Sequence, residues 1–257
     1  MLNDRRKALR AWITGVMESP TYIALSKQTA MVRDMESMAN NIANAATNGF
    51  RGEYTLFQEY LARTGSIGER EKTSFVQDIG EYRDTRDGPL QITNNPLDIA
   101  LQGKGYMVLG NPGQEVYART GVFHLDGNRQ VVTSDGYPLL QENGQPIVIP
   151  QGTNRITITG DGVVSTEQGE AGRIRLVRFG SEQAMRNAGS GTYATDQAPL
   201  PATEVQVTQG ALEGSNVQPV LEMTRMIQMS RDYQSIQNML DAENTRQRDA
   251  VARIARA

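Results

Sequence analysis

Apolar side chains recur at steps of three and four residues near both ends of this chain, and the long middle segment lacks that period. A seam of this spacing is typical of helices that pack side by side as a coiled coil. We therefore expect one helix near each terminus, and we expect the two helices to pack as a coiled-coil-like pair. Beyond a first gap, the N-terminal seam comprises Ala24, Met31, Met35, Met38, Ile42 and Ala45, and the C-terminal seam comprises Met226, Met229, Tyr233, Ile236 and Leu240.

Small polar residues and a glycine mark the inner ends of these helices. Gly49 accepts the left-handed conformation of a helix C-cap because it lacks a Cβ, so the N-terminal helix should stop between about Ala45 and Gly49. The C-terminal helix should start near Ser215 or Asn216, whose side chains can cap a first turn. Pro219 is tolerated because it lies inside that first turn.

The middle of the chain predicts β-structure, because four Asp-Gly pairs separate short apolar runs. Residues 51–89 are polar and show no sustained period, so we expect an extended connector there. The expected fold class is mixed α and β, with a central all-β domain between the terminal helices. The expected divisions are 1–16 as an N-terminal extension, 17–50 as an N-terminal helical assembly segment, 51–89 as the connector, 90–209 as the central β domain and 210–257 as a C-terminal helical assembly segment.

The first sixteen residues are basic and carry the only tryptophan, Trp12. Two interpretations of this segment stay open. It can lie upstream of a real start at Met17, or it can form an amphipathic contact or an export element.

Composition narrows the possible chemistry. With 257 residues, no cysteine, one histidine and a formal net charge of -3, the chain offers no disulfide, no thiolate metal site and no basic surface for nucleic acid. No stretch reaches the roughly 20 consecutive apolar residues of a membrane span, and none has the pattern of a cleaved secretory signal. The single histidine, His124, alternates with apolar neighbours and is interpreted as an ordinary strand residue. We expect no catalytic, cofactor-binding or metal-binding residues.

Three asparagines, Asn40, Asn41 and Asn44, lie on or beside the seam formed by Met38 and Ile42. Their amides can be satisfied by nearby backbone groups at a helix end. Alternatively, they bond across to neighbouring helices, where a buried amide fixes the register of packing.

Two long motifs, one near each terminus, resemble the signatures of the flagellar basal-body rod and hook family. The matching N-terminal positions are Ala39, Asn40, Asn41, Ile42, Ala43, Asn44, Thr47, Gly49, Phe50 and Arg51. The matching C-terminal positions are Leu212, Glu213, Ser215, Asn216, Val217, Glu222, Met223, Met226 and Ile227. The segments LDIALQGKGYMVL and YARTGVFHLDGNRQVVTSDGYPLL resemble the body of the family. Tyr106, Met107, Gln218 and Ile236 depart from its usual residues, and residues 1–16 have no counterpart in it.

Within that family the likeness is greatest to the proximal rod proteins, with the distal rod proteins as the nearest competitor. The resemblance implies a structural tube subunit that has no enzymatic activity and no cofactor. It implies export without processing through the flagellar type III export apparatus, and helical stacking in the periplasm beneath the distal rod. The implied partners are other copies of the chain, the neighbouring proximal and distal rod proteins and the export apparatus. The terminal helices would line the inner wall of the tube, with the β domain facing outward.

Two alternatives come from other classes of protein. One is a rod-associated enzyme that trims peptidoglycan, because an acid pair such as Glu167 and Glu170 can in principle serve as acid and base in glycan cleavage. The other is a free coiled-coil binding module. A glycan-degradation assay and the oligomeric state of the purified chain distinguish these alternatives from the rod subunit.

An isolated helix of this kind is marginal in water, because nucleation is costly and its apolar stripe stays exposed. We therefore expect the terminal segments to be largely disordered in the monomer and to order when neighbouring subunits cover them. Methionines on both helices can fill unequal gaps against non-identical neighbours. The residues expected at the assembly interface are Met31, Met35, Met38, Asn40, Asn41, Ile42, Asn44, Gly49, Phe50, Leu212, Ser215, Asn216, Val217, Met223, Met226, Ile227, Tyr233, Ile236 and Leu240.

Overall fold

The computed structural model of this protein describes residues 2–64, 71–111 and 113–256, with side chains for 23–56, 80–110 and 113–254. These residues form two compact units. The terminal unit comprises Met1–Ile42, Glu53–Tyr82 and Pro219–Ala257, and the β unit comprises Ala43–Gly52 and Arg83–Gln218. Each unit therefore depends on contacts between segments that lie far apart in the sequence.

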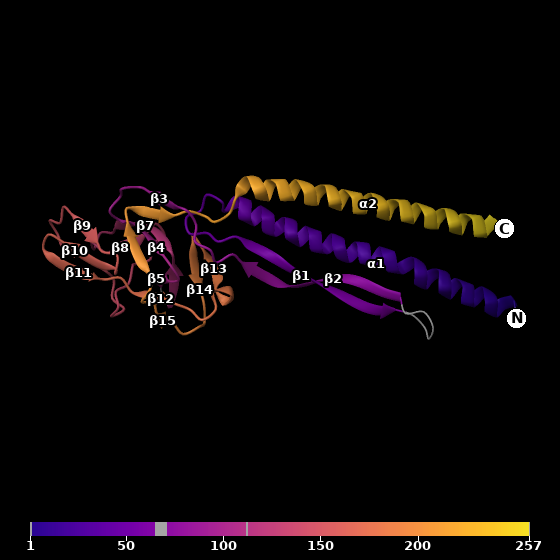
Figure 1. The fold of residues 1–257 in the computed structure, drawn as a ribbon, viewed down its shortest axis with the longest axis horizontal. Helices are drawn as coiled ribbons and strands as arrows, with labels where there is room; N and C mark the ends of the chain where they lie inside the picture. Colours follow the sequence, from indigo (N-terminus) through magenta and orange to yellow (C-terminus); the bar gives the residue numbers. More distant parts are fainter. Residues whose placement is uncertain (1, 65–70, 112, 257) are drawn as a thin grey trace. The chain divides into compact units, whose positions relative to one another are not determined.

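The terminal unit contains both long helices and a two-stranded ribbon (Figure 1). The helices are α1 (Leu2–Ala43) and α2 (Pro219–Arg256), and the ribbon pairs β1 (Glu53–Thr64) with β2 (Glu71–Arg83). Gln28 of α1 donates a side-chain hydrogen bond to Gln237 of α2 at 2.9 Å. The first turn of α2 lies near the start of β1, where the Tyr54 hydroxyl donates to Glu222 at 3.4 Å. Figure 1 shows that the two helices run in opposite directions.

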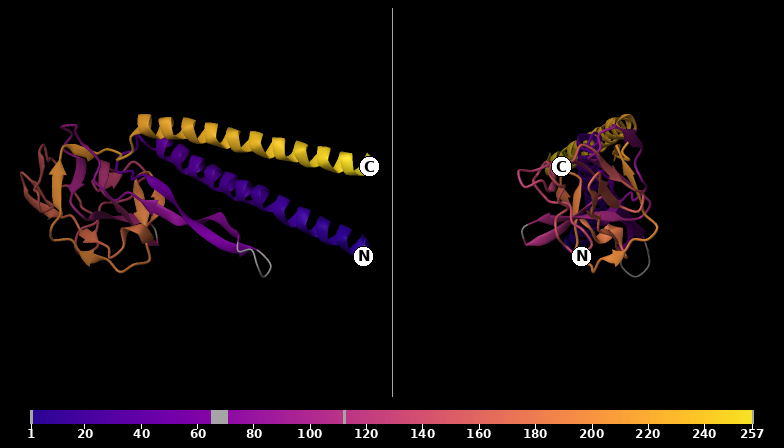
Figure 2. Two further views of the ribbon diagram at one scale, coloured as in Figure 1. Left: turned by 45° about the vertical axis from the view of Figure 1, so that its right-hand side comes forward. Right: turned by 90° about the vertical axis from the view of Figure 1, so that its left-hand side faces the viewer.

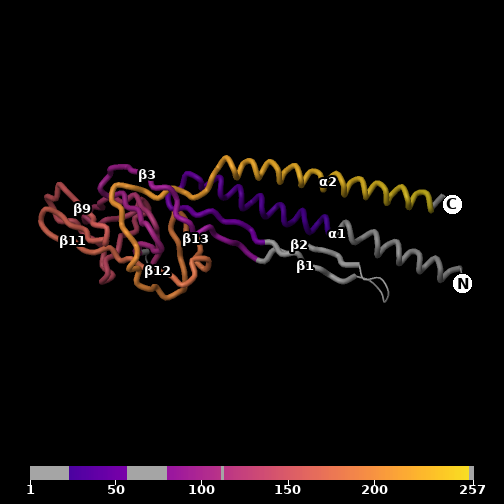
Figure 3. Tube along the Cα trace, viewed as in Figure 1, coloured from indigo at the N-terminus to yellow at the C-terminus, as the bar shows by residue number. Residues whose placement is uncertain are grey.

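Figure 2 gives two further views of the helices, and Figure 3 traces α2 beside the part of α1 from residue 23 onward. Over the residues that the structure describes, neither helix has the long apolar window that crossing a membrane requires.

The expected coiled-coil-like pairing of the two helices is wrong. A coiled coil buries the seam of both partners, whereas every seam residue of α2 from Met226 to Leu240 is only half-buried. Ser37 and Asn41 of α1 bond instead to the backbone of Glu53 in β1, so the ribbon takes part in covering α1. The seam spacing indicates that one face of a helix is covered, but it does not specify which element covers it.

The β1–β2 ribbon falls where the sequence analysis expects an extended connector. Both strands contain tyrosine, phenylalanine and threonine, which favour β-structure. Charged residues are interspersed among them and hide any sustained alternation of apolar and polar positions. The pairing of the two strands therefore left no periodic signal in the sequence.

The β unit is built from four antiparallel sheets, which agrees with the expected central β domain. The six-stranded sheet has the order β13 (Arg186–Gly189), β14 (Thr192–Ala194), β6 (Gln114–Ala118), β5 (Tyr106–Asn111), β12 (Leu176–Arg178) and β15 (Leu200–Pro201). The four-stranded sheet has the order β16 (Gln206–Gln209), β4 (Asp98–Gln102), β7 (Thr120–Leu125) and β8 (Val131–Thr133). The smaller sheets are β11 (Gly169–Arg173), β10 (Val163–Thr166) and β9 (Ile156–Ile158), and the pair β17 (Ala211–Glu213) and β3 (Leu90–Ile92).

Strand β5 is buried on both faces and separates two hydrophobic clusters. Met107 and Leu109 point into the larger cluster, and Tyr106 and Val108 point into the smaller one. This division follows from the alternation of side chains along a strand. The core of the β unit therefore lies on both sides of the six-stranded sheet.

Candidate functional site

The two terminal motifs meet inside the β unit. The Gly49 amide donates to the carbonyl of Glu213 at 2.8 Å, and the Asn216 amide donates to the carbonyl of Phe50 at 3.3 Å. The Gly52 amide donates to the side-chain oxygen of Asn216 at 2.9 Å. We name this contact between residues 47–52 and residues 211–217 the motif junction.

Gly49 is required by the local geometry of the motif junction. Helix α1 ends at Ala43, two residues before the expected range, and the chain then turns through Gly49 with a φ of 70°. A Cβ at this position would lie 2.9 Å from Cγ2 of Thr120. Any other residue would therefore meet both backbone strain and a steric contact.

The Asn216 amide connects three passages of the chain. Its oxygen accepts from Gly52, and its nitrogen donates to the carbonyls of Asp84 at 2.9 Å and Arg86 at 3.0 Å. The sequence analysis expects Asn216 or Ser215 to cap the C-terminal helix, but the Asn216 side chain binds these loop backbones instead. It thereby fixes the position of the chain just before α2 begins.

Arg119, between β6 and β7, lies at the centre of an ionic cluster that adjoins the motif junction and is largely buried, with Asp87 as its half-exposed member. Its side chain is 0% exposed, and its Nε donates to Glu213 at 2.8 Å. Its Nη1 donates to the carbonyls of Gly103 at 2.6 Å and Gly105 at 3.0 Å. Its Nη2 donates to Asp87 at 2.9 Å. A single arginine thus connects the C-terminal motif with the sheets of the β unit.

Arg51 brings the N-terminal motif into the same cluster. Its guanidinium pairs with Glu182 at 2.6 Å and with Asp87 at 3.1 Å, and Asp87 also accepts from Arg119. Glu213 in turn accepts from the backbone amide of Gly88 at 3.0 Å. We name the set of Arg51, Asp87, Arg119, Glu182 and Glu213 the ionic cluster.

Burial and charge act together on the titration of this cluster. Burial lowers the pKa of Arg51, but the nearby Tyr106, Glu182 and Glu213 outweigh that effect, and the pKa is raised above its usual value. Burial raises the pKa of the Tyr106 phenol, whose hydroxyl donates to Glu182 at 3.2 Å. Arg51 therefore stays charged and Tyr106 stays neutral throughout the physiological range.

The ionic cluster is suited to holding segments in place. Breaking a buried ion pair by removing one partner costs about 3–5 kcal/mol, because the other charge remains buried and uncompensated. Arg51 and Glu213 come from the two terminal motifs, so the cluster specifies where both motifs lie. Arginine side chains stay protonated in proteins, so the two cations of the cluster cannot exchange protons with a substrate.

Asn41 in the terminal unit is satisfied within its own chain. Its side-chain nitrogen donates to the carbonyl of Glu53 at 2.8 Å, and its side-chain oxygen accepts from the amide of Glu53 at 2.9 Å. The residue is 0% exposed. Asn44 likewise accepts from the nearby Thr47 hydroxyl at 3.3 Å. For Asn41 and Asn44 these bonds follow the interpretation in which nearby groups satisfy the amides.

The predicted interface residues fall into three classes of exposure. The structure buries Met31, Met38, Asn41, Gly49, Phe50, Leu212, Ser215 and Val217, half-buries Met35, Ile42, Asn44, Asn216, Met226, Tyr233, Ile236 and Leu240, and exposes Asn40, Met223 and Ile227. The members from the two motif ends come together at the motif junction, and the seam members lie in the terminal unit. Their part in contacts between subunits stays a prediction.

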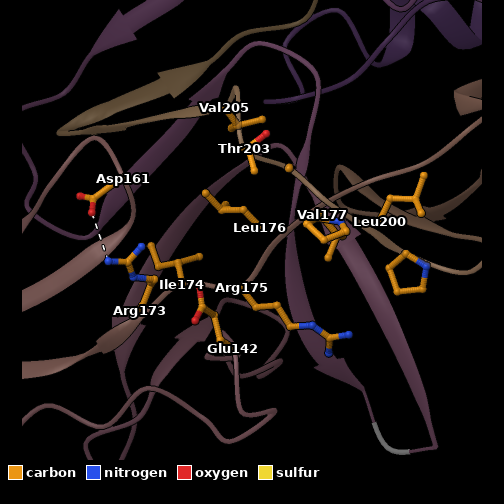
Figure 4. Close-up of a pocket in the computed structure, with 13 residues that line it drawn as sticks. Glu142, Asp161, Arg173, Ile174, Arg175, Leu176, Val177, Leu200, Thr203 and Val205 are labelled. Carbon is orange, nitrogen blue, oxygen red and sulfur yellow. Dashed lines mark ion pairs between the residues drawn. The ribbon is translucent and has the colours of Figure 1, made fainter.

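A cavity of about 530 Å³ opens in the β unit between β11, β12 and β15 (Figure 4). In Figure 4 the ion pair of Asp161 and Arg173, 3.3 Å long, lies on one side of it and Leu200 on the other. A hydrogen bond from Thr159 and the nearby Arg173 lower the pKa of Asp161. A carboxyl group with a lowered pKa is a poor proton donor, so Asp161 does not fit the general acid of glycan cleavage.

The acid pair considered in the sequence analysis, Glu167 and Glu170, also lacks the expected setting. Both side chains are exposed where β10 turns into β11, outside the residues that line the cavity. A pair of catalytic carboxylates must flank a bound sugar. The positions of these two residues give no support to the glycan-cleaving alternative.

Sequence reasoning missed three members of the ionic cluster. Asp87 belongs to one of the four Asp-Gly pairs that predict tight turns, and no local pattern singles out Arg119 or Glu182. The partners of Arg119 lie 32 and 94 residues away in the sequence, so no local spacing reveals them. The one available signal was an arginine inside a strand-forming, apolar segment, because such a charge requires a partner when buried.

Comparisons with known proteins identify relatives over almost the whole chain. The family model for the flagellar hook protein FlgE/F/G D1 domain matches residues 100–166, and the model for the flagellar basal body rod FlgEFG protein C-terminal region matches residues 208–253. The flagellar basal-body rod protein FlgF of Caulobacter vibrioides is 35% identical over 243 residues, which cover 93% of this chain and 99% of the relative. FlgF of Salmonella typhimurium is 31% identical, covering 85% and 91%. FlgG of Caulobacter vibrioides is 34% identical, covering 82% and 90%.

Proposed function

Because this chain belongs to the flagellar basal-body rod protein family and is a structural subunit of that rod, we propose that it forms the proximal part of the rod by helical polymerisation. The family resemblance stated from the two terminal motifs is confirmed. The observation that supports the proximal assignment is the match to FlgF of Caulobacter vibrioides over 99% of that relative's length. The FlgG relatives keep the distal rod as the second candidate.

The motif junction gives this proposal a physical basis. Together with the ionic cluster, it holds the inner ends of both terminal segments by hydrogen bonds and ion pairs. A subunit that transmits torque needs such fixed connections, because mobile ones would absorb the applied rotation. The ionic cluster therefore has a mechanical role, and the protein acts without enzymatic chemistry.

The proposed partners are other copies of the chain and the neighbouring proximal and distal rod proteins. We place the assembled subunit in the periplasmic part of the basal body. Delivery occurs through the flagellar type III export apparatus, without removal of a signal peptide. The C-terminal seam and the outer faces of α1 and α2 are the surfaces available for these contacts.

The assignment is tested by the order of assembly. The gene is deleted and complemented with an epitope-tagged copy, and basal bodies are purified from strains that lack either this chain or the distal rod protein. The tagged chain should co-purify with basal bodies even when the distal rod protein is absent. Loss of the chain from those basal bodies would reassign it to the distal rod, and intact rods in its own deletion strain would overturn the rod function.

A further inference from the structure

Both helices of the terminal unit carry a second apolar row that stays exposed among the residues whose side chains the structure describes. On α1 the row consists of Leu25, Val32 and Ala39, and we name it the outer α1 row. All three side chains are exposed, Leu25 at 53% and Val32 at 38%. Each follows a buried residue of the inner face by one position, so the row lies about 100° around the helix from that face.

The corresponding row on α2 consists of Val220, Met223 and Ile227, and we name it the outer α2 row. These side chains are 78%, 49% and 55% exposed. Met223 and Ile227 each follow, by one position, a residue that faces the rest of the terminal unit. A contiguous exposed apolar row on a helix marks a surface that another element covers.

The two outer rows match in spacing. Val32 follows Leu25 by seven positions, and Ile227 follows Val220 by seven positions. This step is about 10.5 Å along either helix. Two antiparallel helices can therefore bring Leu25 against Ile227 and Val32 against Val220 at the same time. In this register Glu36, which is exposed and lies one turn beyond Val32, reaches the N-terminal end of α2. The positive end of the helix dipole is complementary to that carboxylate.

The outer rows of a single chain cannot meet in this register. Gln28 is level with Gln237 within the chain, so Leu25 is level with a position near Leu240. Ile227 then lies about 20 Å farther along the helix axis. The partner row must therefore come from another molecule, and a second copy carries a row of matching spacing in the required register. Copies in a helical assembly share one axial direction, so α1 of one copy and α2 of the next are antiparallel, as the register requires.

We propose that the outer α2 row of one copy packs against the outer α1 row of the next copy, a contact that rests on the proposed rod function. The contact is heterologous, since it joins two different surfaces, and its repetition produces an open helical array instead of a closed ring or dimer. Met223 and Ile227 belong to the interface residues expected from the sequence, whereas Val220, Leu25 and Val32 do not.

The absence of cysteine from the native sequence allows a clean cross-linking test in purified basal bodies. Two differently tagged copies are expressed together in the deletion strain, one carrying Leu25→Cys and the other Ile227→Cys. A second pair carries Val32→Cys and Val220→Cys. The matched control combines Leu25→Cys with Met239→Cys, because Met239 is 52% exposed on the same helix but lies outside the outer row. All five side chains are exposed, so each substitution should leave the fold intact.

We expect disulfide-linked heterodimers from both outer-row pairs and at most about one tenth as much from the control pair. Equal yields from all three pairs, or none from the outer-row pairs in basal bodies that contain both tagged copies, would overturn the proposed contact and leave the rod function standing. Cross-links to a different rod protein alone would also overturn it. Basal bodies that contain neither tagged copy would overturn the rod function itself.

Discussion

Replacing Arg119 by methionine should destabilise the β unit more than most single substitutions elsewhere in the chain. The arginine is 0% exposed, and it neutralises Glu213, whose side chain is only 2% exposed. Methionine fills much of the same volume but leaves that carboxylate buried and uncompensated. The expected loss is about 3–5 kcal/mol of unfolding free energy, the cost of breaking a buried ion pair.

The loss is measured by urea unfolding of the purified chain, followed by near-ultraviolet circular dichroism of the tyrosines that pack beside the cluster. For a urea dependence of about 2 kcal/mol per molar, the midpoint should fall by about 2 M. Adding Glu213→Gln to Arg119→Met removes the stranded charge. The double variant should therefore be less destabilised than the sum of the single variants, by about 1–3 kcal/mol.

Arg186 provides the matched control, because it forms an exposed ion pair with Asp196. The side chains of Arg186 and Asp196 are 70% and 86% exposed. Arg186→Met should change the unfolding free energy by no more than about 1 kcal/mol. The reasoning fails if Arg119→Met costs no more than this control. It fails equally if the effects of Arg119→Met and Glu213→Gln simply add, because the two charges would then be energetically independent.

Three further outcomes follow from the local geometry. Gly49→Ala should cost about 1–3 kcal/mol more than Gly113→Ala in urea unfolding. Both glycines have positive φ, so the backbone strain cancels, and only Gly49 has a close neighbour; equal losses would contradict this. Asn41→Ala should cost about 1–3 kcal/mol and speed amide exchange at the start of β1, where its two backbone partners lie; unchanged exchange there would contradict it. A side-chain hydrogen bond from Arg86 lowers the pKa of Asp84. The ionised Asp84 carboxylate therefore stabilises the fold at pH values above its unfolded-state pKa of about 4, and this stabilisation is lost as the pH falls through the lower pKa of the folded state. Urea midpoints between pH 5 and pH 2 should fall less for Asp84→Asn than for the native chain, and parallel curves would contradict this.

The sequence predicted what depends on local chemistry. The steps of three and four residues located both helices, and the glycine that accepts a left-handed conformation marked the turn after α1 to within a few residues. The strand-and-turn pattern of the middle segment predicted the β unit. These features follow from the properties of neighbouring residues alone.

The sequence did not predict what depends on partners far along the chain. Asp87 looks like a turn residue, and only the fold shows that it neutralises both Arg51 and Arg119. Asn41 is expected at the interface between subunits, yet its side chain bonds to the start of β1. No periodic pattern in the sequence predicts the ribbon to which β1 belongs. An apolar seam indicates which face of a helix is covered. Which element covers that face depends on the three-dimensional path of the chain.

The bonds between Gly49 and Glu213 and between Phe50 and Asn216 have a consequence for how such chains can diversify. They bring together the two places where the polypeptide passes into and out of the sheets. An insertion or deletion in any intervening loop would change the size of the body without altering the separation of those two places. Relatives could therefore vary the bulk of this region widely while the terminal segments keep one common spacing.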